Sequence, residues 1–241
     1  MGRSLILACA VLSAAGCTAR PTVIVFSRTT SFRHESIPAA TATVKDIAED
    51  LGCDVIITED PEVFVDQRWT IAAFINTTGD VLNDDQQAVF QRVIENGGGY
   101  FGAHAAADTE FDWPWYGEEL VGAWFVRHPR IQEATISVVD TSHPATADLT
   151  STWKRTDEWY DYDRIPDAQV LLELDVHSYE GSLMKDRHPI AWCRQVGAGR
   201  SFYTGGGHTI AAWSEPAFRA HVRGALQWLL NEDKMNANGD S

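Results

Sequence analysis

The segment from Gly97 to Asp108 constrains the fold of this chain more than any other part of the sequence. Consecutive glycines lead into a short apolar run, which continues into small residues on both sides of His104. Small residues around one reactive side chain are typical of a tight strand-to-helix turn, because larger neighbours would clash there. Such turns commonly carry a serine or cysteine nucleophile, whereas imidazole serves more often as a proton carrier or metal ligand. The segment therefore predicts an α/β fold whose turn performs other chemistry.

The first half of the chain alternates between apolar, β-branched runs and helix-like segments. We expect strands at 23–26, 54–58, 71–76 and 100–103, with helices at 38–51 and 83–96. This alternation indicates parallel βαβ units with helices on both faces of the sheet. Functional residues collect at the carboxyl ends of strands in such sheets, which is where His34 and His104 fall.

The second half is less regular. We expect part of 113–125 to be helical, a closing amphipathic helix at 216–230, and strands at 131–139, 170–174, 189–196 and 201–204. The last strand ends in a glycine run followed by His208, which matches the position of His104. Residues 231–241 form a polar tail, and no linker divides the chain into two domains.

The N-terminal residues have the layout of a signal peptide rather than of a folded element. Arg3 precedes an apolar run that is too short to span a bilayer, and the small residues before Cys17 are similar to a bacterial lipobox. We expect residues 1–16 to be removed, Cys17 to be lipidated, and residues 17–22 to tether an extracytoplasmic domain that meets the membrane only through its lipid. The alternative is ordinary secretory cleavage near the same point, which gives a soluble secreted or periplasmic protein.

Composition limits the partners. A net charge of −15 opposes sequence-independent binding to nucleic acid, which requires Lys/Arg surfaces.

The domain keeps Cys53 and Cys193, which can be buried thiols or, in an oxidising compartment, a disulfide. The tryptophans are either large core residues or sugar-stacking platforms. The candidates for the wall of a sugar-binding cleft are Trp113, Trp115, Trp124, Trp159 and Tyr160.

Four chemically active side chains are candidates for one site. His104 and His208 follow matching strand ends, and His34 lies where a helix begins and backbone N–H groups favour anionic or hydroxyl-rich ligands. Glu158 lies in an acidic and aromatic run that is either a solvated loop or a site where apolar walls tune a carboxyl pKa. The same four residues offer nitrogen and oxygen donors for a divalent metal, although no short metal-binding spacing is present.

The order of motifs resembles the ThuA-like (trehalose utilisation) family of the class I glutamine amidotransferase-like superfamily. In chain order the motifs are Phe32-Arg33-His34, Gly102–Asp108, Trp113–Tyr116, Leu120–Ala123 with Phe125, His128-Pro129, His143-Pro144, Asp157–Tyr160, Pro189–Trp192, Gly197–Arg200 and Gly206–His208. The resemblance covers 23–230 and implies a three-layer, flavodoxin-like α/β fold with a mostly parallel central sheet. It places His104 where amidotransferases carry their cysteine and His208 at the partner histidine, which excludes glutaminase activity by the thiolate route.

The resemblance also implies a role in the metabolism of trehalose-type glycosides and their keto derivatives. We expect an isomerase, lyase or hydrolase that acts on a small-molecule sugar or keto-sugar, with His104, His208 and Glu158 as acid/base groups or metal ligands. The expected substrate-binding residues are His34, Arg33, Asp108, Trp113, Tyr116, His128, Trp159 and Tyr160. The alternative is a non-catalytic carbohydrate-binding protein on the same fold. The sequence leaves the reaction, the metal and the oligomeric state open.

Overall fold

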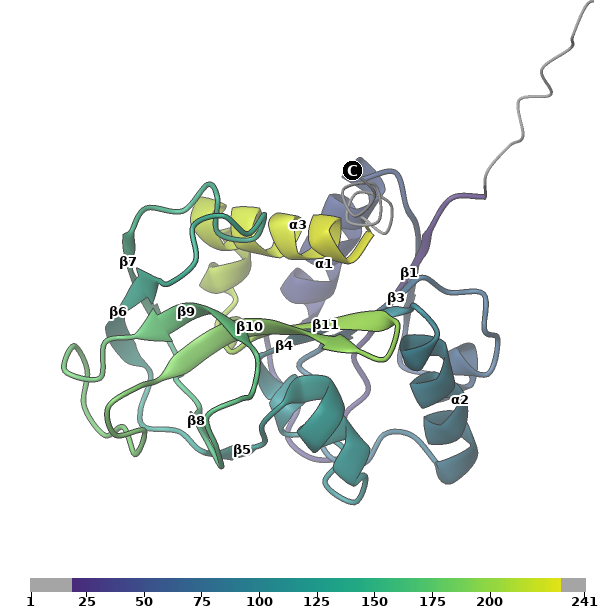
Figure 1. The fold of residues 1–241 in the computed structure, drawn as a ribbon, viewed down its shortest axis with the longest axis horizontal. Coiled ribbons are helices and arrows are strands. Elements are labelled where there is room, and N and C mark those ends of the chain that lie inside the picture. The colour runs from purple at the N-terminus through teal and green to yellow at the C-terminus, as the bar shows by residue number, and fades with distance from the viewer. Residues whose placement is uncertain (1–18, 231–241) are drawn as a thin grey trace, which may run out of the picture.

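A computed structural model describes residues 19–230, in which a nine-stranded sheet lies between helices on its two faces (Figure 1). The strand order is β2-β1-β3-β4-β11-β10-β9-β6-β7. The expected leader, the lipidation site Cys17 and the polar tail lie outside the described residues. Of the expected tether, Arg20 bonds the carbonyl groups of Gly52 and Cys53 through its guanidinium. No helix within residues 19–230 is long and apolar enough to cross a membrane.

One half of the sheet is parallel. It consists of β2 (Asp54–Thr58), β1 (Thr22–Phe26), β3 (Ile71–Ile75), β4 (Gly99–Ala103) and β11 (Gly199–Thr204). Every residue of β3 and β4 is buried, as expected for parallel strands covered on both faces. The expected α/β fold with helices on both faces is confirmed, and the carboxyl ends of these five adjacent strands lie at the same edge of the sheet.

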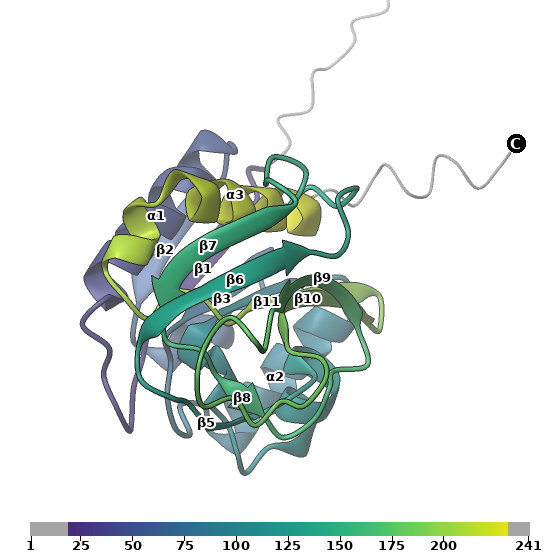
Figure 2. The same ribbon diagram turned by 90° about the vertical axis from the view of Figure 1, so that its left-hand side faces the viewer.

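The other half of the sheet is antiparallel. It adds β10 (Pro189–Val196), β9 (Gln169–Leu174), β6 (Gln132–Val138) and β7 (Thr152–Asp157), of which β6 and β7 run side by side in Figure 2. A separate ribbon pairs β5 (Phe125–Arg127) with β8 (Asp161–Tyr162).

Strand β7 was not predicted from the sequence, because its buried positions are not all apolar. Trp153, Arg155 and Asp157 are buried while the residues between them are exposed. Two of the three buried side chains are charged, so the apolar alternation that predicts a half-buried strand is absent.

The helices lie where the sequence predicts them. The amphipathic helices α1 (Ile37–Asp50) and α3 (Pro216–Leu230) cover one face of the sheet, and α2 (Asp84–Glu95) covers the other (Figure 1). The side chain of Asn83 accepts from the backbone N–H of Gln86, whose side chain accepts from the N–H of Asn83. This capping box fixes the start of α2. The expected helix within 113–125 is a short π-helical turn, Tyr116–Val121.

The helix α3 packs on the 143–146 loop through Gly224. A Cβ at this position would lie 2.6 Å from the Cα of Ala145 and would overlap the carbonyl group of Pro144. We expect Gly224→Ala to lower the free energy of unfolding by about 1–3 kcal/mol, because overpacking outweighs the better helix propensity of alanine. Urea unfolding measures this change, with Arg223→Ala at an exposed position of the same helix as the control. A stabilised Gly224→Ala protein would contradict the packing.

The two cysteines of the domain are free and buried, so the alternative of a Cys53–Cys193 disulfide is wrong. Four strands separate β2, which follows Cys53, from β10, which contains Cys193. Neighbouring strands lie about 4.8 Å apart, so the two thiols are roughly 20 Å or more apart. Burial raises the pKa of the Cys193 thiol to about 12, which keeps it protonated.

Candidate functional site

The strand ends of the parallel half-sheet carry a group of polar residues in unusual backbone conformations. His104 follows β4 directly and has φ +49°, and Asn76 follows β3 with φ +51°. Left-handed backbone is uncommon for residues with a side chain, and such strain is concentrated at functional sites. The turn expected after Gly102 is therefore present, with His104 as its strained residue.

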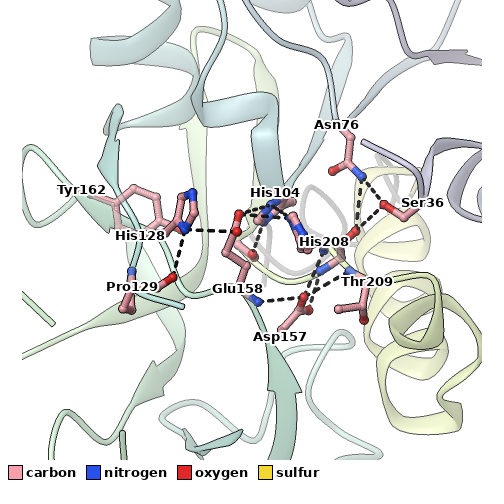
Figure 3. Close-up of polar contacts among 12 residues, drawn as sticks. Ser36, Asn76, His104, His128, Pro129, Asp157, Glu158, Tyr162, His208 and Thr209 are labelled. Carbon is pink, nitrogen blue, oxygen red and sulfur yellow. Dashed lines mark hydrogen bonds and ion pairs between the residues drawn. The ribbon is translucent and has the colours of Figure 1, made fainter. Parts of the chain in front are cut away.

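The side chains of His34, His104, Glu158 and His208 converge, and we call them the His–Glu cluster. One donor atom from each residue lies within 4.8 Å of those of the other three. Glu158 Oε2 lies 3.1 Å from His208 Nδ1 and 3.4 Å from His104 Nε2, and these two nitrogens are 3.1 Å apart (Figure 3). The rings of His34 and His104 meet edge to face, with centroids 5.0 Å apart. The structure thus brings together four residues that are spread over 175 positions of sequence.

Each member of the cluster is held by a neighbour outside it. His104 Nδ1 donates to the carbonyl oxygen of Gly205 at 2.9 Å, and the Tyr160 ring packs on the imidazole with centroids 4.1 Å apart. His128 Nδ1 lies 3.1 Å from Glu158 Oε1 and 2.9 Å from the carbonyl oxygen of Pro129 (Figure 3). Because carbonyl and carboxylate oxygens only accept, the proton of His128 is on Nδ1. These contacts fix both rings and turn the other oxygen of Glu158 toward the cluster.

His208 is positioned through its backbone by Asp157, a residue whose role the sequence analysis did not identify. The buried carboxylate accepts from the amide groups of Gly207 at 2.8 Å, His208 at 3.1 Å and Thr209 at 3.3 Å (Figure 3). Arg155 Nη2 lies 3.0 Å from Asp157 Oδ2, and Arg155 Nε lies 3.1 Å from Glu215 Oε2, although neither contact is aligned as a hydrogen bond. The buried charges of β7 therefore shape the loop that carries His208.

A second polar contact joins the same loop to β3 and α1. The side-chain amide of Asn76 donates to Ser36 Oγ at 2.9 Å and to the carbonyl oxygen of Gly207 at 3.2 Å. Ser36 is the N-cap residue of α1, but its side chain does not cap the helix and donates to the carbonyl oxygen of Gly207 instead. The contacts of Asn76 were not predicted, because the sequence around it does not reveal its left-handed backbone.

The surroundings set the charges of the site. Burial, aided by repulsion from His104 and His208, lowers the pKa of His34 to about 3 and keeps it neutral. Burial opposes ionisation of Glu158, but its contacts with His104 and His208 outweigh burial and hold its pKa well below the usual range. Burial also disfavours a charged His208, yet its contact with Glu158 raises its pKa. Burial raises the pKa of the Asp108 carboxyl to about 6.

The cluster opens into a cavity of about 460 Å³. Its lining residues are Phe32, His34, Asp108, Phe125, His128, Glu158, Tyr160 and His208. A second hollow of about 340 Å³ shares Phe32, His34 and His208 with it. Its other lining residues are Glu35, Ser36, Ile131, Thr209 and Ile210. A larger hollow of about 650 Å³ lies beside the opposite, amino-terminal ends of β1 and β2, where it is lined by exposed ion-paired side chains and no cluster of this kind.

Four of the eight expected substrate-binding residues line the cavity, and four do not. His34, Asp108, His128 and Tyr160 line it beside Glu158 and His208, while His104 is fully buried behind them. The exposed Arg33 instead pairs with Glu59 at 2.6 Å. Tyr116 is buried and its hydroxyl donates to the carbonyl oxygen of Ala106.

The tryptophans expected in a sugar-binding cleft lie elsewhere. Trp113 stacks on Trp115 away from the cavity, and Trp159 is fully buried with its indole N–H donating to the carbonyl oxygen of Gln132. Trp124 packs against Phe111. Of the expected cleft aromatics only Tyr160 lines the cavity. The other aromatic residues in its wall are Phe32 and Phe125, which were not predicted to line a site.

Comparison with solved structures places the same fold in several proteins. A ThuA-like protein from Bacteroides uniformis is 23% identical with a TM-score of 0.73, and the match covers 92% of this chain and 96% of that one. A ThuA-like protein from Parabacteroides merdae is 19% identical with a TM-score of 0.73, over 88% and 90% of the two chains. A β-galactosidase from Bacillus circulans is 13% identical with a TM-score of 0.58, and the match covers 87% of this chain but 30% of that enzyme. These likenesses concern the fold.

Sequence comparison identifies the family. No protein of curated function matches the chain. The family model ThuA, described as trehalose utilisation, matches residues 22–229, which is nearly the whole of the described chain. The resemblance carried by the sequence motifs is thereby confirmed, and the chain belongs to the ThuA family.

Proposed function

We propose that this protein is an enzyme that removes a proton from the carbon next to the carbonyl group of an oxidised (keto) sugar. The observation that carries the proposal is the pairing, in one cavity, of a carboxyl group whose pKa is raised to about 6 with the His–Glu cluster. Proton abstraction of this kind needs a base poised near the working pH and an electrophilic group at the carbonyl oxygen. Asp108 supplies the first and the cluster marks the place of the second.

The dimensions and lining of the site favour a glycoside of about two sugar units. The cavity of about 460 Å³ lies within the usual range for small-molecule sites, and the second hollow shares His34 and His208 with it. Aromatic and polar side chains both line it, a combination that suits the C–H faces and hydroxyl groups of a sugar. The description of the family as trehalose utilisation supports a disaccharide, one ring of which carries the ketone.

The proposed step conserves atoms and charge. Asp108 takes the proton of the carbon beside the ketone, and the C–H electron pair forms a C=C bond. The carbonyl π electrons move to the oxygen, which becomes an enolate that faces the His–Glu cluster. Return of the proton to the same carbon from the opposite face gives an epimer. Where that carbon carries a hydroxyl group, transfer of the hydroxyl proton to the enolate oxygen gives the isomeric enolate, and protonation of the former carbonyl carbon then gives an isomeric ketone. Departure of a substituent from the next carbon, with its bonding pair, gives an elimination product.

Asp108 is a better base than Glu158, the carboxylate expected from the sequence. Both oxygens of Glu158 are engaged, Oε1 by His128 and Oε2 by His104 and His208. A carboxylate that accepts hydrogen bonds from His128 and His208 is stabilised as an anion and has little tendency to take up a proton. Glu158 therefore orients and charges the cluster, while Asp108 exchanges the proton.

Exchange of solvent deuterium into a keto-glycoside tests the proposal without knowledge of the final product. We expect the protein to catalyse incorporation at the carbon beside the ketone of 3-keto-trehalose, and none into trehalose, which lacks the ketone. His177→Ala removes an exposed histidine outside the cavity and serves as the matched control with full activity. Saturable binding of the keto-sugar with no exchange over long incubation would replace this proposal with the non-catalytic binding protein.

A further inference from the structure

We propose that the His–Glu cluster is the binding site for one divalent transition-metal ion. Three imidazoles and one carboxylate offer the nitrogen and oxygen donors that zinc, manganese, iron, cobalt and nickel accept in proteins. His34, His104 and Glu158 are buried and His208 is half-buried. No short sequence motif contributes, because the four ligands come from four separate loops.

The spacing of the donor atoms matches the edges of a coordination polyhedron. Bonds of about 2.1 Å from a metal to nitrogen or oxygen place neighbouring ligand atoms roughly 3.0 Å apart at right angles and roughly 3.4 Å apart in a tetrahedron. Glu158 Oε2, His104 Nε2 and His208 Nδ1 form a triangle with edges of 3.1, 3.1 and 3.4 Å. An ion at bonding distance from all three therefore requires little rearrangement.

Protons alone leave this triangle poorly satisfied. His104 Nδ1 faces only the carbonyl oxygen of Gly205, so its proton is on Nδ1 and a lone pair on Nε2 points into the cluster. That lone pair is 3.4 Å from the carboxylate oxygen of Glu158, which is a second acceptor. The single proton on His208 Nδ1 is the one donor for both acceptors, His104 Nε2 and Glu158 Oε2. His34 Nδ1 is buried without a hydrogen-bond partner in the described chain. A cation at the centre converts these opposed lone pairs into bonds.

The outer contacts are those that usually support a metal site. The backbone carbonyl of Gly205 fixes the tautomer of His104, and His128 holds the free oxygen of Glu158. Asp157 anchors the backbone of His208 through three amide groups. The cavity lies on the open side of the cluster, where a bound ion supplies positive charge to an oxygen of the substrate. This use of the ion rests on the proposed function, whereas its binding does not require a sugar.

Metal binding is measured on the full chain, without a histidine tag, after dialysis against a chelator. We expect roughly one equivalent of Zn²⁺ by calorimetry and mass spectrometry, and visible absorption bands on addition of Co²⁺. Glu158→Gln keeps an acceptor for His128, and His104→Asn keeps a donor for Gly205 in a residue that tolerates left-handed backbone. Each variant is expected to weaken Zn²⁺ binding by more than about 100-fold, because loss of an outer contact alone costs 10–100-fold. His177→Ala is the control with unchanged affinity.

Each outcome decides a different point. The proposal would be overturned if the chelator-treated wild-type chain bound less than about a fifth of an equivalent of Zn²⁺ and of Co²⁺. It would also be overturned if both variants, folded by circular dichroism, bound Zn²⁺ with wild-type affinity. Metal binding without deuterium exchange into keto-trehalose would leave the metal site standing and overturn the proposed function. Deuterium exchange that is equally fast after chelator treatment, in a protein that binds no metal, would overturn the metal site and leave the proposed function standing.

Discussion

Replacing Asp108 with asparagine is expected to slow deuterium exchange into a keto-glycoside by roughly 10²–10⁴-fold, the usual contribution of a positioned general base. The amide is nearly isosteric with the carboxylate and keeps a polar group in the wall of the cavity. It has no site that accepts a proton at neutral pH. Binding of the keto-sugar should change far less than turnover, because the loss falls on the transition state.

The pH dependence follows from the same residue. Burial raises the pKa of Asp108 to about 6, and a base acts only when it is deprotonated. We therefore expect the ratio kcat/KM for exchange to fall as pH decreases through about 6 and to level off above it. In Asp108→Asn the residual exchange should lose this acid limb. Initial rates between pH 4.5 and 8 at roughly constant ionic strength measure both profiles.

Asp112→Asn is the matched control for Asp108→Asn. Asp112 is exposed and lies four residues away on the same segment, so its change removes one carboxylate without altering the cavity. We expect wild-type exchange and an unchanged acid limb for this control. Wild-type activity in Asp108→Asn would show that another group removes the proton. An acid limb that survives in Asp108→Asn would assign that limb to a different residue.

Replacing Asp157 with asparagine is expected to lower the free energy of unfolding by about 3 kcal/mol. The change removes the negative partner of the buried Arg155 and brings an NH₂ donor against backbone N–H groups of the loop at 207–209. Breaking a buried ion pair typically costs about 3–5 kcal/mol, and the lower end applies because Glu215 remains beside Arg155. Urea unfolding followed by tryptophan fluorescence measures the loss.

Asp54→Asn is the control for this change in charge. Asp54 forms an ion pair with Arg20 at 3.1 Å, but both side chains are more than half exposed. We expect its replacement to cost less than about 0.5 kcal/mol, since exposed pairs contribute little. The double change of Asp157→Asn with Arg155→Met should recover part of the stability by removing the unpaired charge. A cost below about 1 kcal/mol in Asp157→Asn would show that the loop does not depend on this carboxylate.

The parallel half of the fold was readable from the sequence because local patterns determine it. The β-branched run at 23–26 is long enough and apolar enough to be a buried strand, and Asn83 with Gln86 forms a capping box that starts α2. The glycines before His104 likewise predict its tight turn. Each of these signals lies within a few residues of the element that it specifies.

The antiparallel half and the wall of the cavity were harder to predict for a physical reason. The strand β7 buries Arg155 and Asp157, whose charges are stabilised only by partners far away in the sequence, such as the amides of 207–209. The positions of the tryptophans were hard to predict for another reason. Their size suits both a core and a sugar platform, and local sequence does not distinguish the two.

Local periodicity and the ordered motifs of the sequence predict the family and the α/β architecture, and they point to the four residues of the His–Glu cluster. Packing of the folded chain brings ligand atoms of His34, His104, Glu158 and His208 within 4.8 Å of one another, engages both oxygens of Glu158, and raises the pKa of Asp108 to about 6. The reason is that burial and the distances between lone pairs set the chemistry of a carboxylate or imidazole. Both arise only when segments separated by as many as 174 residues pack together.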